Sequence, residues 1–461
     1  MKALRNQYLL HADDVPTHWY NILADVDVPT TDVRRARSAA AERETGLLAP
    51  NIPLSMYRSS VGKDRFVEIP RQVREHYQRW RPTPLFRAHA LEQALDTPAH
   101  LYYKFEGTNG AGSHKLNSAL AQAYFYKNAG VRELTTGTGA GQWGTALAMA
   151  AQAFDLDCTA FMVRCSFDQK PYRRVMMELH GARVVPSPSP VTSTGRAVLG
   201  STPDSPGSLA IASSEALEHA RSLPGGRYAV GSGENHVLLH QTVIGEEALR
   251  QMELAGEFPD VVIAAMGTGS NFAGLAFPFY REKLRSGAAT RLVAVEPDAC
   301  PKLTRGRYAW DYNDVFGTTP MTKMYTLGHT FVPPGMHAGG LRYHGAAPLV
   351  SALYERRAIE AVAYGQNAVF EAGTLFARTE NLVPAPESAH AVRAAVDEAM
   401  RARAERRSTV ILFNVSGHGL LDLSAYDQYL AGVLPDHAVS DEQIAASLAR
   451  LPDADDAGAG S

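Results

Sequence analysis

The stretch Glu106-Gly107-Thr108-Asn109-Gly110-Ala111-Gly112-Ser113-His114-Lys115 decides how this chain is organised. An apolar run, Leu101 to Phe105, precedes it and predicts a strand, and residues 116–127 have the periodicity of a helix. Glycines let a backbone approach a ligand closely, and free N–H groups at a helix start attract anions. Lys115 can pair there with a phosphate or form a Schiff base with a carbonyl cofactor, and a solvated lysine on an ordinary crossover turn is the alternative.

The composition is that of an ordinary globular chain, and it argues against several classes of function. The 461 residues are enough for two lobes with large cores, and a net charge of −3 gives no electrostatic basis for binding nucleic acid or an anionic membrane. The cysteines lack metal-ligand spacing, so we expect free thiols in a reducing compartment. Because neither a signal peptide nor a run of ~20 apolar residues is evident, we expect a cytoplasmic protein.

A pattern of strand, glycine-rich turn and helix recurs along the chain after Leu101. Residues 132–136 are strand-like and lead into the glycine-rich residues 137–144. The apolar run 260–265 leads into the turn 267–271 in the same way. Strands that alternate with helices predict an α/β fold with two doubly wound parallel-sheet lobes.

The expected division of the chain follows from its prolines and from this alternation. Prolines interrupt residues 1–80, which we interpret as an N-terminal strap packed on the body. The remainder is predicted as a first lobe (81–225), a second lobe (226–430), and a C-terminal helix with a disordered tail (431–461). Within the lobes, we expect loops over residues 186–208 and 297–345 and a mostly helical segment over 358–379.

The turn Gly267-Thr268-Gly269-Ser270-Asn271 offers consecutive N–H groups, two hydroxyls and a helix start, which are typical of a phosphate cradle. The same segment also fits the glycine pattern of a nicotinamide-binding turn, with Glu296 at the end of the next strand as a ribose ligand. From these residues alone, a nicotinamide-dependent oxidoreductase is an open alternative.

Several motifs together resemble one enzyme family. Lys115 after its glycine turn, Gly139-Ala140-Gly141-Gln142, the turn 267–271 and Ser416-Gly417-His418-Gly419 are similar to the tryptophan synthase β-chain family, whose members use pyridoxal phosphate (PLP) in the type II fold. The longer, second β-chain branch is the most similar, and the resemblance runs from about Trp19 to Leu423. Further matching segments are Trp19 to Leu23, Arg81 to Leu85, Gln169 to Arg174, His337 to Gly345 and Pro386 to His390.

The resemblance assigns roles to named positions. It implies that Lys115 holds PLP as a Schiff base and then moves the substrate's α-proton. The implied cofactor-binding residues are His114, Lys115, Gly267, Thr268, Gly269, Ser270, Asn271, Glu387 and Ser416. The implied binding residues for the substrate's α-carboxylate are Thr138, Gly139, Ala140, Gly141 and Gln142. The alternatives are a packed histidine at His114 and a helix N-terminal glutamate at Glu387, and Thr268 replaces the family's usual glycine.

The resemblance also bears on reaction type and partners. Ser416 would face the pyridine nitrogen with a hydroxyl and leave it largely unprotonated, which suits β-elimination over transamination. An amino-acid substrate with a nucleophile, a homodimer, an α-subunit that supplies indole, and a monovalent cation are implied in the same way. No other metal is expected, because His337 and His344 lack acidic or thiol partners nearby and are interpreted as packed loop histidines.

Position 137 departs from the family pattern, which places a glutamate directly before the run Thr138 to Gln142. In the family that carboxylate helps the β-hydroxyl of serine to leave and takes the proton of indole, and such help is typically worth ~10²–10⁴-fold in rate. Here the residue is Gly137. We expect it to vacate space in which a different nucleophile fits.

Two hypotheses follow from this departure. The first is a carbon–oxygen lyase that carries out β-replacement or β-elimination on a serine-like donor with a changed donor or nucleophile. Another carboxylate stands in on this hypothesis, and Glu106 is one candidate. The second is a catalytically impaired or accessory homologue that keeps the fold and the cofactor.

Overall fold

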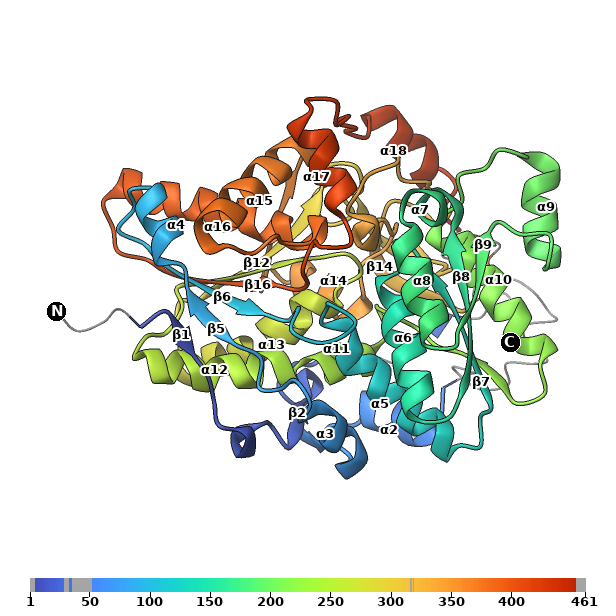
Figure 1. Ribbon diagram of the computed structural model, residues 1–461, viewed down its shortest axis with the longest axis horizontal. Helices are drawn as coiled ribbons and strands as arrows, with labels where there is room; N and C mark the ends of the chain where they lie inside the picture. Colours follow the sequence, from blue (N-terminus) through green and yellow to red (C-terminus); the bar gives the residue numbers. More distant parts are fainter. Residues whose placement is uncertain (1–4, 29–32, 35–51, 316, 318, 453–461) are drawn as a thin grey trace.

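A seven-stranded sheet lies at the centre of the molecule, in a computed structural model that describes residues 5–28, 33–34, 52–315, 317 and 319–452 (Figure 1). The strand order is β1-β5-β6-β16-β11-β12-β15. The bounds are β1 (Gln7–Tyr8), β5 (Leu85–Arg87), β6 (His100–Phe105), β16 (Val410–Val415), β11 (Val261–Ala265), β12 (Arg291–Pro297) and β15 (Glu360–Tyr364). The strands from β6 to β15 in this order run parallel, whereas β1, β5 and β6 pair antiparallel.

Helices cover both faces of this sheet because its parallel strands are apolar on both sides. Every residue of β11 is buried. In Figure 1, α15 (Gln366–Glu380) and α16 (Pro386–Glu405) lie above the sheet, and α12 (Val243–Ala255) and α13 (Ser270–Ser286) lie below it. Because the strands are parallel, β6, β16 and β11 end at the same edge, where the loops that follow them meet.

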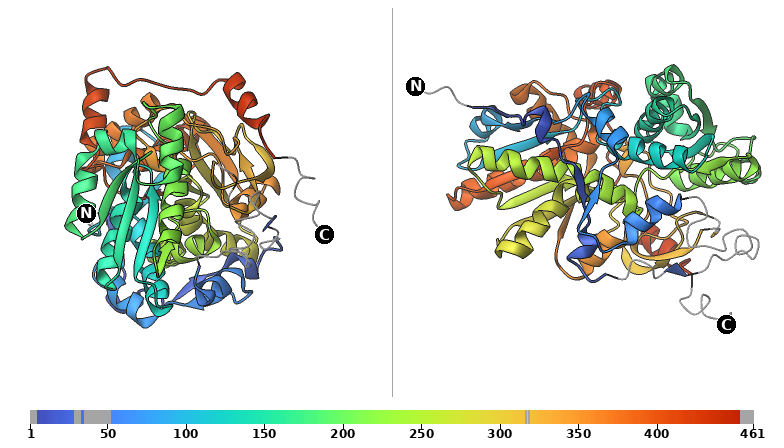
Figure 2. Two further views of the ribbon diagram at one scale, coloured as in Figure 1. Left: turned by 90° about the vertical axis from the view of Figure 1, so that its right-hand side faces the viewer. Right: turned by 90° about the horizontal axis from the view of Figure 1, so that it is seen from below.

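A second, four-stranded sheet forms the other half of the molecule. Its order is β10-β7-β8-β9 and all its pairs are parallel. The strands are β10 (Gly226–Tyr228), β7 (Glu133–Thr138), β8 (Asp157–Val163) and β9 (Arg183–Ser187). Helices α6 (Gln142–Ala153) and α8 (Pro171–Leu179) lie on one face and α10 (Leu209–Ser222) on the other (Figure 1; Figure 2, left). This sheet is therefore also wound on both sides.

The described part of the N-terminal segment packs on the body rather than forming a unit of its own. Strand β2 (His18–Tyr20) pairs with β4 (Phe66–Glu68), and Trp19 and Tyr20 are fully buried in the main core. Figure 2 (right) shows this blue segment along the underside of the molecule. The other helices are α2 (Leu54–Val61), α3 (Arg71–Tyr77), α4 (His89–Ala94), α5 (Lys115–Asn128), α7 (Arg164–Gln169), α9 (Ser193–Ser201), α11 (Asn235–Gln241), α14 (Pro348–Glu355), α17 (Leu423–Leu430) and α18 (Asp441–Leu448).

The predicted α/β class with two doubly wound parallel-sheet lobes is confirmed. The larger sheet nevertheless carries an antiparallel edge. It also contains β6, whose residues were assigned to the first lobe (81–225), because β6 pairs with β16 from the second lobe. The boundaries 1–80, 226–430 and 431–461 stay predictions, and the tail from residue 453 lies outside the described residues.

Three expected loop or helix segments contain elements that were not predicted. Helix α9 lies within residues 186–208. Thr192 is its N-cap, because Thr192 Oγ1 accepts a hydrogen bond from Gly195 N. Strands β13 (Arg307–Asp311) and β14 (Met321–Thr326) form a hairpin within 297–345, joined at its edge by β3 (Val33–Arg34). Residues 360–364 form strand β15 rather than helix, because they extend the large sheet beside β12.

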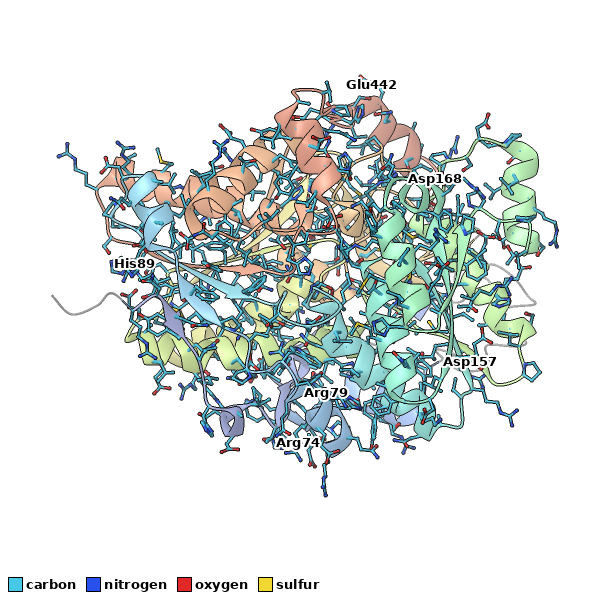
Figure 3. All side chains as sticks on the ribbon, in the orientation of Figure 1. Arg74, Arg79, His89, Asp157, Asp168 and Glu442 are labelled. Carbon is cyan, nitrogen blue, oxygen red and sulfur yellow. The ribbon has the colours of Figure 1, made fainter. Side chains whose placement is uncertain are left out.

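The charged side chains labelled in Figure 3 lie at the periphery, and they carry both signs. Arg74 lies on α3, Arg79 follows that helix, Asp157 begins β8, and Glu442 lies on α18. In the part of the chain that is described, no helix has the length and apolar character needed to cross a membrane.

Candidate functional site

Two adjoining cavities open where the loops after β6, β7, β11 and β16 converge. The larger has a volume of about 290 Å³ and is lined by residues of the four-stranded sheet and of the turns that follow β6 and β11, and the smaller has a volume of about 40 Å³. Five residues line both of them: Lys115, Gln142, Ser232, Thr268 and Gly340. The smaller cavity is lined by most of the predicted cofactor-binding residues, and the larger by Thr138, Gly139, Ala140 and Gln142 from the predicted carboxylate loop.

Lys115 is placed at the junction of the two cavities by the turn that precedes it. Asn109 closes this turn, because its Nδ2 donates to Ser113 O (2.9 Å) and its Oδ1 accepts from Ala111 N (3.0 Å). Gly112 takes a left-handed conformation with φ of +68°, which favours glycine. The turn then delivers Lys115 as the first residue of α5. Burial lowers the pKa of its amine, while the charge of Glu387 opposes that shift.

His114 links the turn to two other loops of the site. Its Nε2 lies 3.4 Å from Ser270 Oγ, and its Nδ1 lies 3.4 Å from the carbonyl oxygen of Ser416. Burial and then the neighbouring Lys115 charge lower its pKa well below the ordinary histidine value. The imidazole is therefore neutral, with Nδ1 as donor to Ser416 O and Nε2 as acceptor from Ser270 Oγ.

The turn Gly267 to Asn271 has the shape of an anion cradle. Gly269 adopts φ of +139°, and a Cβ atom on Gly267 would lie 2.5 Å from Gly340 O, so neither position tolerates a side chain. The turn opens α13 at Ser270, whose first N–H groups have no partner within the helix. The side chain of Asn271 is hydrogen bonded to the protein: it donates to Ala265 O (2.9 Å) and accepts from Asn414 Nδ2 (2.6 Å).

Ser416 and Glu387 form another part of the wall of the smaller cavity, directly after β16 and at the start of α16. Ser416 Oγ is 2.9 Å from Ser388 Oγ, and Ser388 Oγ also accepts from Gly417 N (3.1 Å). Sequence reasoning missed Ser388, although it stands next to Glu387 in a motif already singled out. The buried Glu387 Oε2 has no hydrogen-bond partner among the described residues, so it is available to a bound group.

The predicted carboxylate loop joins β7 to α6. Gly141 has φ of +94° and precedes the first residue of α6, Gln142, and the Oγ1 of Thr138 accepts from Gly144 N (3.1 Å). Gly139 passes close to Gly339, whose carbonyl oxygen a Cβ atom at 139 would approach to 2.9 Å. The loop therefore presents a helix N-terminus to the larger cavity, and that end of a helix favours an anion.

Gly137 lines the larger cavity, but a Cβ atom at this position would point at α10. A Cβ atom there would lie 2.7 Å from Ser213 N and 2.9 Å from Ala212 C, in the backbone of α10. In this direction α10 packs directly against the strand, but Gly137 also lines the larger cavity, so the expectation that it vacates room for a nucleophile stays a prediction.

Glu106 does not stand in for the missing carboxylate. It is fully buried, and its two oxygens accept from Arg81 Nη2 (2.6 Å), Thr83 Oγ1 (2.6 Å) and Asn117 Nδ2 (3.2 Å). Neither cavity is lined by Glu106. This hypothesis was wrong because sequence proximity to Lys115 said nothing about the direction of the side chain.

The nicotinamide alternative also conflicts with the geometry. Glu296, the expected ribose ligand, is fully buried and accepts from Leu303 N (3.0 Å), Thr304 N (2.8 Å) and Thr304 Oγ1 (2.7 Å). Its carboxylate therefore caps the next segment of backbone and is not free to bind a sugar.

The two loop histidines hydrogen bond to protein groups. His337 Nε2 lies 3.0 Å from Gln428 Oε1, and His344 Nε2 donates to Tyr312 O at 2.9 Å. Within the described ranges, no group of three His, Cys, Asp or Glu side chains is arranged to hold a metal ion.

Comparison with known proteins gives consistent results. Residues 77–417 match the family described as pyridoxal-phosphate dependent enzyme. The chain is 53% identical over 433 residues to tryptophan synthase beta chain 2 of Aquifex aeolicus, covering 93% of this chain and 100% of that protein. It is 51% identical over 450 residues to the protein of that name from Aeropyrum pernix, covering 97% and 100%.

Solved structures agree on the fold. The processed form of threonine deaminase isoform 2 from Solanum lycopersicum superposes with a TM-score of 0.56 at 18% identity, covering 76% of this chain and 86% of that one. A fungal L-serine ammonia-lyase from Rhizomucor miehei gives a TM-score of 0.55 at 15% identity, covering 76% and 97%.

Proposed function

Because this chain belongs to the pyridoxal-phosphate dependent enzymes and, within them, to the tryptophan synthase β chains, we propose that it catalyses β-replacement or β-elimination on a serine-like amino acid. The observation that carries the proposal is the position of Lys115, which lines both the smaller cavity with its anion cradle and the larger cavity. Such an enzyme acts as a carbon–oxygen lyase toward its donor. An amino acid and a nucleophile are its substrates.

The residues of the smaller cavity fit pyridoxal phosphate. The cradle at Gly267 to Asn271 would receive the phosphate, since its glycines exclude side chains and its helix start favours an anion. His114, neutral and adjacent to Ser270, adds no competing charge. Ser416, held by Ser388, would face the pyridine nitrogen as a hydroxyl. When bound, the cofactor withdraws electrons from the substrate's α-carbon.

The chain's own groups would then act around the substrate. The lowered pKa of Lys115 favours its neutral amine, which can accept the α-proton at the junction of the cavities. The N-terminus of α6 and its Thr138 to Gln142 loop would hold the α-carboxylate. Gln142 Nε2 donates to Glu387 Oε1 (2.8 Å), so the substrate loop and the cofactor wall are tied together.

Homodimer formation, a cytoplasmic location and an α-subunit partner belong to the proposal as well, and they rest on the family alone. A catalytically impaired homologue that binds the cofactor is the second candidate, and it is motivated by the glycine at position 137. The lining of both cavities around Lys115 favours an active enzyme over it.

The test begins with cofactor attachment. After loading with pyridoxal phosphate and reduction with borohydride, mass spectrometry should locate the adduct on Lys115. Lys115→Arg should abolish it, whereas Lys127→Arg, at the exposed far end of the same helix, should not. Holoenzyme should then release pyruvate or form a new amino acid with at least one β-substituted alanine. An adduct without any turnover would favour the impaired homologue, and the absence of an adduct at Lys115 would refute both.

A further inference from the structure

A carboxyl group outside the predicted site faces the larger cavity. Glu234 lines the same cavity as Lys115, Gly137 and Thr138. Its backbone begins α11, since its carbonyl accepts from Val237 N (2.9 Å), but its side chain does not cap the helix. Among the described residues, its carboxyl group has no hydrogen-bond or ion-pair partner, and burial raises its pKa. Partnerless and partly buried carboxyl groups in a reaction cavity are candidates for proton transfer.

The backbone holds Glu234 close to both functional loops. Ser232 Oγ donates to Ser270 Oγ of the cradle at 3.3 Å. A Cβ atom on Gly233 would lie 2.7 Å from Thr268 Cγ2, and one on Gly231 would meet the ring of Trp143, next to Gln142, at 2.5 Å. These close approaches fix the segment between the cradle and the carboxylate loop, so the position of Glu234 is set from both sides.

Other carboxylates near the site are either hydrogen bonded within the larger cavity or line only the smaller one. Asp314 also lines the larger cavity, but its Oδ1 accepts from Thr319 N (2.8 Å) and Thr319 Oγ1 (2.7 Å). Glu387 lines only the smaller cavity, and its Oε1 accepts from Gln142 and from Gly340 N (2.8 Å). Glu234 is thus the carboxyl group among the described residues that combines a place in the substrate cavity with freedom from protein partners.

The tyrosines around Glu234 do not take its proton-transfer role. Tyr228 and Tyr343 line the cavity beside it, and burial, then the charge of neighbours that include Glu234, raises the pKa of each hydroxyl. The buried Tyr126 is affected in the same way. These phenols stay protonated near neutral pH and can donate hydrogen bonds, whereas Glu234 can change its protonation state.

We propose that Glu234 is the acid–base group that serves the β-carbon of the substrate, the role for which the family pattern places a carboxylate at position 137. The inference rests on the proposed function. As the Cβ–O bond of the donor breaks, its electron pair leaves with the oxygen, and the proton of Glu234 moves onto that oxygen. When a nucleophile adds, its lone pair forms the new bond to Cβ and its proton passes to the Glu234 carboxylate. The carboxyl group is thereby restored, and the donor's water or alcohol is released.

The test compares leaving groups in the holoenzyme. An oxygen-linked donor such as serine needs a proton on its leaving group, whereas β-chloroalanine releases chloride without one. Glu234→Gln should slow the oxygen-linked donor by ~10²–10⁴-fold and β-chloroalanine by less than about tenfold. Glu234→Asp should recover part of the loss. The visible spectrum and the affinity for pyridoxal phosphate should stay unchanged, because Glu234 does not line the smaller cavity.

Asp314→Asn is the matched control, since it removes a carboxylate from the same cavity but leaves an amide oxygen for Thr319. It should not change the ratio of the two rates. Equal slowing of both donors by Glu234→Gln, or a wild-type enzyme that uses β-chloroalanine and no oxygen-linked donor, would overturn the inference while leaving the proposed function intact. A wild-type enzyme without turnover on any donor would overturn the proposed function, and the inference with it.

Discussion

Gln142 Nε2 donates a 2.8 Å hydrogen bond to Glu387 Oε1, across a sequence separation of 245 residues. The two residues begin helices that pack on different sheets. Gln142 begins α6 on the four-stranded sheet, and Glu387 lies in the first turn of α16 on the seven-stranded sheet. Glu387 Oε1 also accepts from Gly340 N (2.8 Å). One carboxylate therefore joins the predicted substrate loop to the predicted cofactor wall.

This bond predicts energetic coupling between the two positions. Hydrogen bonds to charged groups contribute about 1.5–3 kcal/mol, and residues in direct contact couple by about 0.5–3 kcal/mol. We expect Gln142→Ala and Glu387→Ala to be non-additive in kcat/KM by an amount in this range. The measurement is a double-mutant cycle on the holoenzyme. Additive effects would show that the bond does not transmit substrate binding to the cofactor wall.

A side chain at position 137 should destabilise the protein. Gly137→Ala places a Cβ atom 2.7 Å from the backbone of α10, and overpacking of this kind costs about 1–3 kcal/mol. Gly137→Glu should be worse, and it should not create an efficient serine-and-indole enzyme. Urea unfolding of the variants measures the loss. Gly200→Ala, in open space on α9, is the control and should be neutral or slightly stabilising. A Gly137→Ala variant as stable as the wild type would contradict the packing.

A buried ion network at the start of the Lys115 turn should contribute strongly to the stability of the fold. Arg81 pairs with Glu106 (2.6 Å) and Glu247 (2.8 Å), Lys104 pairs with Glu247 (2.7 Å), and all four side chains are fully buried. Removing one partner of a buried pair leaves an uncompensated charge and costs about 3–5 kcal/mol. Arg81→Met should show this loss in urea unfolding. Arg71→Met, which breaks an exposed pair with Glu75, should change stability by less than about 1 kcal/mol.

The same network predicts acid sensitivity with a definite sign. Burial by itself would raise the pKa of Glu247, but Arg81 and Lys104 lower it overall. Its stabilising contribution is therefore complete above the ordinary glutamate value of 4.5 and is lost as pH falls through the lowered folded value. Urea unfolding at a series of pH values measures this effect. The difference in free energy of unfolding between wild type and Glu247→Gln should narrow as pH falls below 4.5. A constant gap would contradict the assignment.

Capture of the cofactor should report the environment of Lys115. Burial lowers the pKa of its amine, and the carboxylate of Glu387 opposes the shift. Since the neutral amine attacks an aldehyde, the rate of pyridoxal phosphate capture by cofactor-free protein should rise with pH. The midpoint of this rise should lie below 10.5. Glu387→Gln should move this midpoint lower still. Stopped-flow absorbance measures both, with Glu371→Gln on the exposed face of α15 as control. A midpoint raised by Glu387→Gln would contradict the electrostatic argument.

Local sequence patterns determined the strand–turn–helix units and the loops that carry chemistry. Alternating apolar runs and helical periodicity predicted β6, β7, β11 and their following helices, because these signals come from neighbouring residues. The glycines at 141 and 269 marked turns that require positive φ. Strand β15 was missed since its pairing partner β12 lies far away in sequence, and the β13–β14 hairpin was missed since its short strands carry a weak periodic signal.

The tertiary structure alone decided which side chains share a cavity. Parallel strands ending at one edge brought Lys115, Ser416 and the cradle together, as the strand order allowed. In the folded protein, Glu106 is part of a buried ion network and α10 packs against Gly137. Glu234, by contrast, lines the larger cavity. The direction of a side chain depends on contacts with distant residues, and its proton affinity depends on their charges and on the exclusion of water, so neither can be obtained from spacing along the chain.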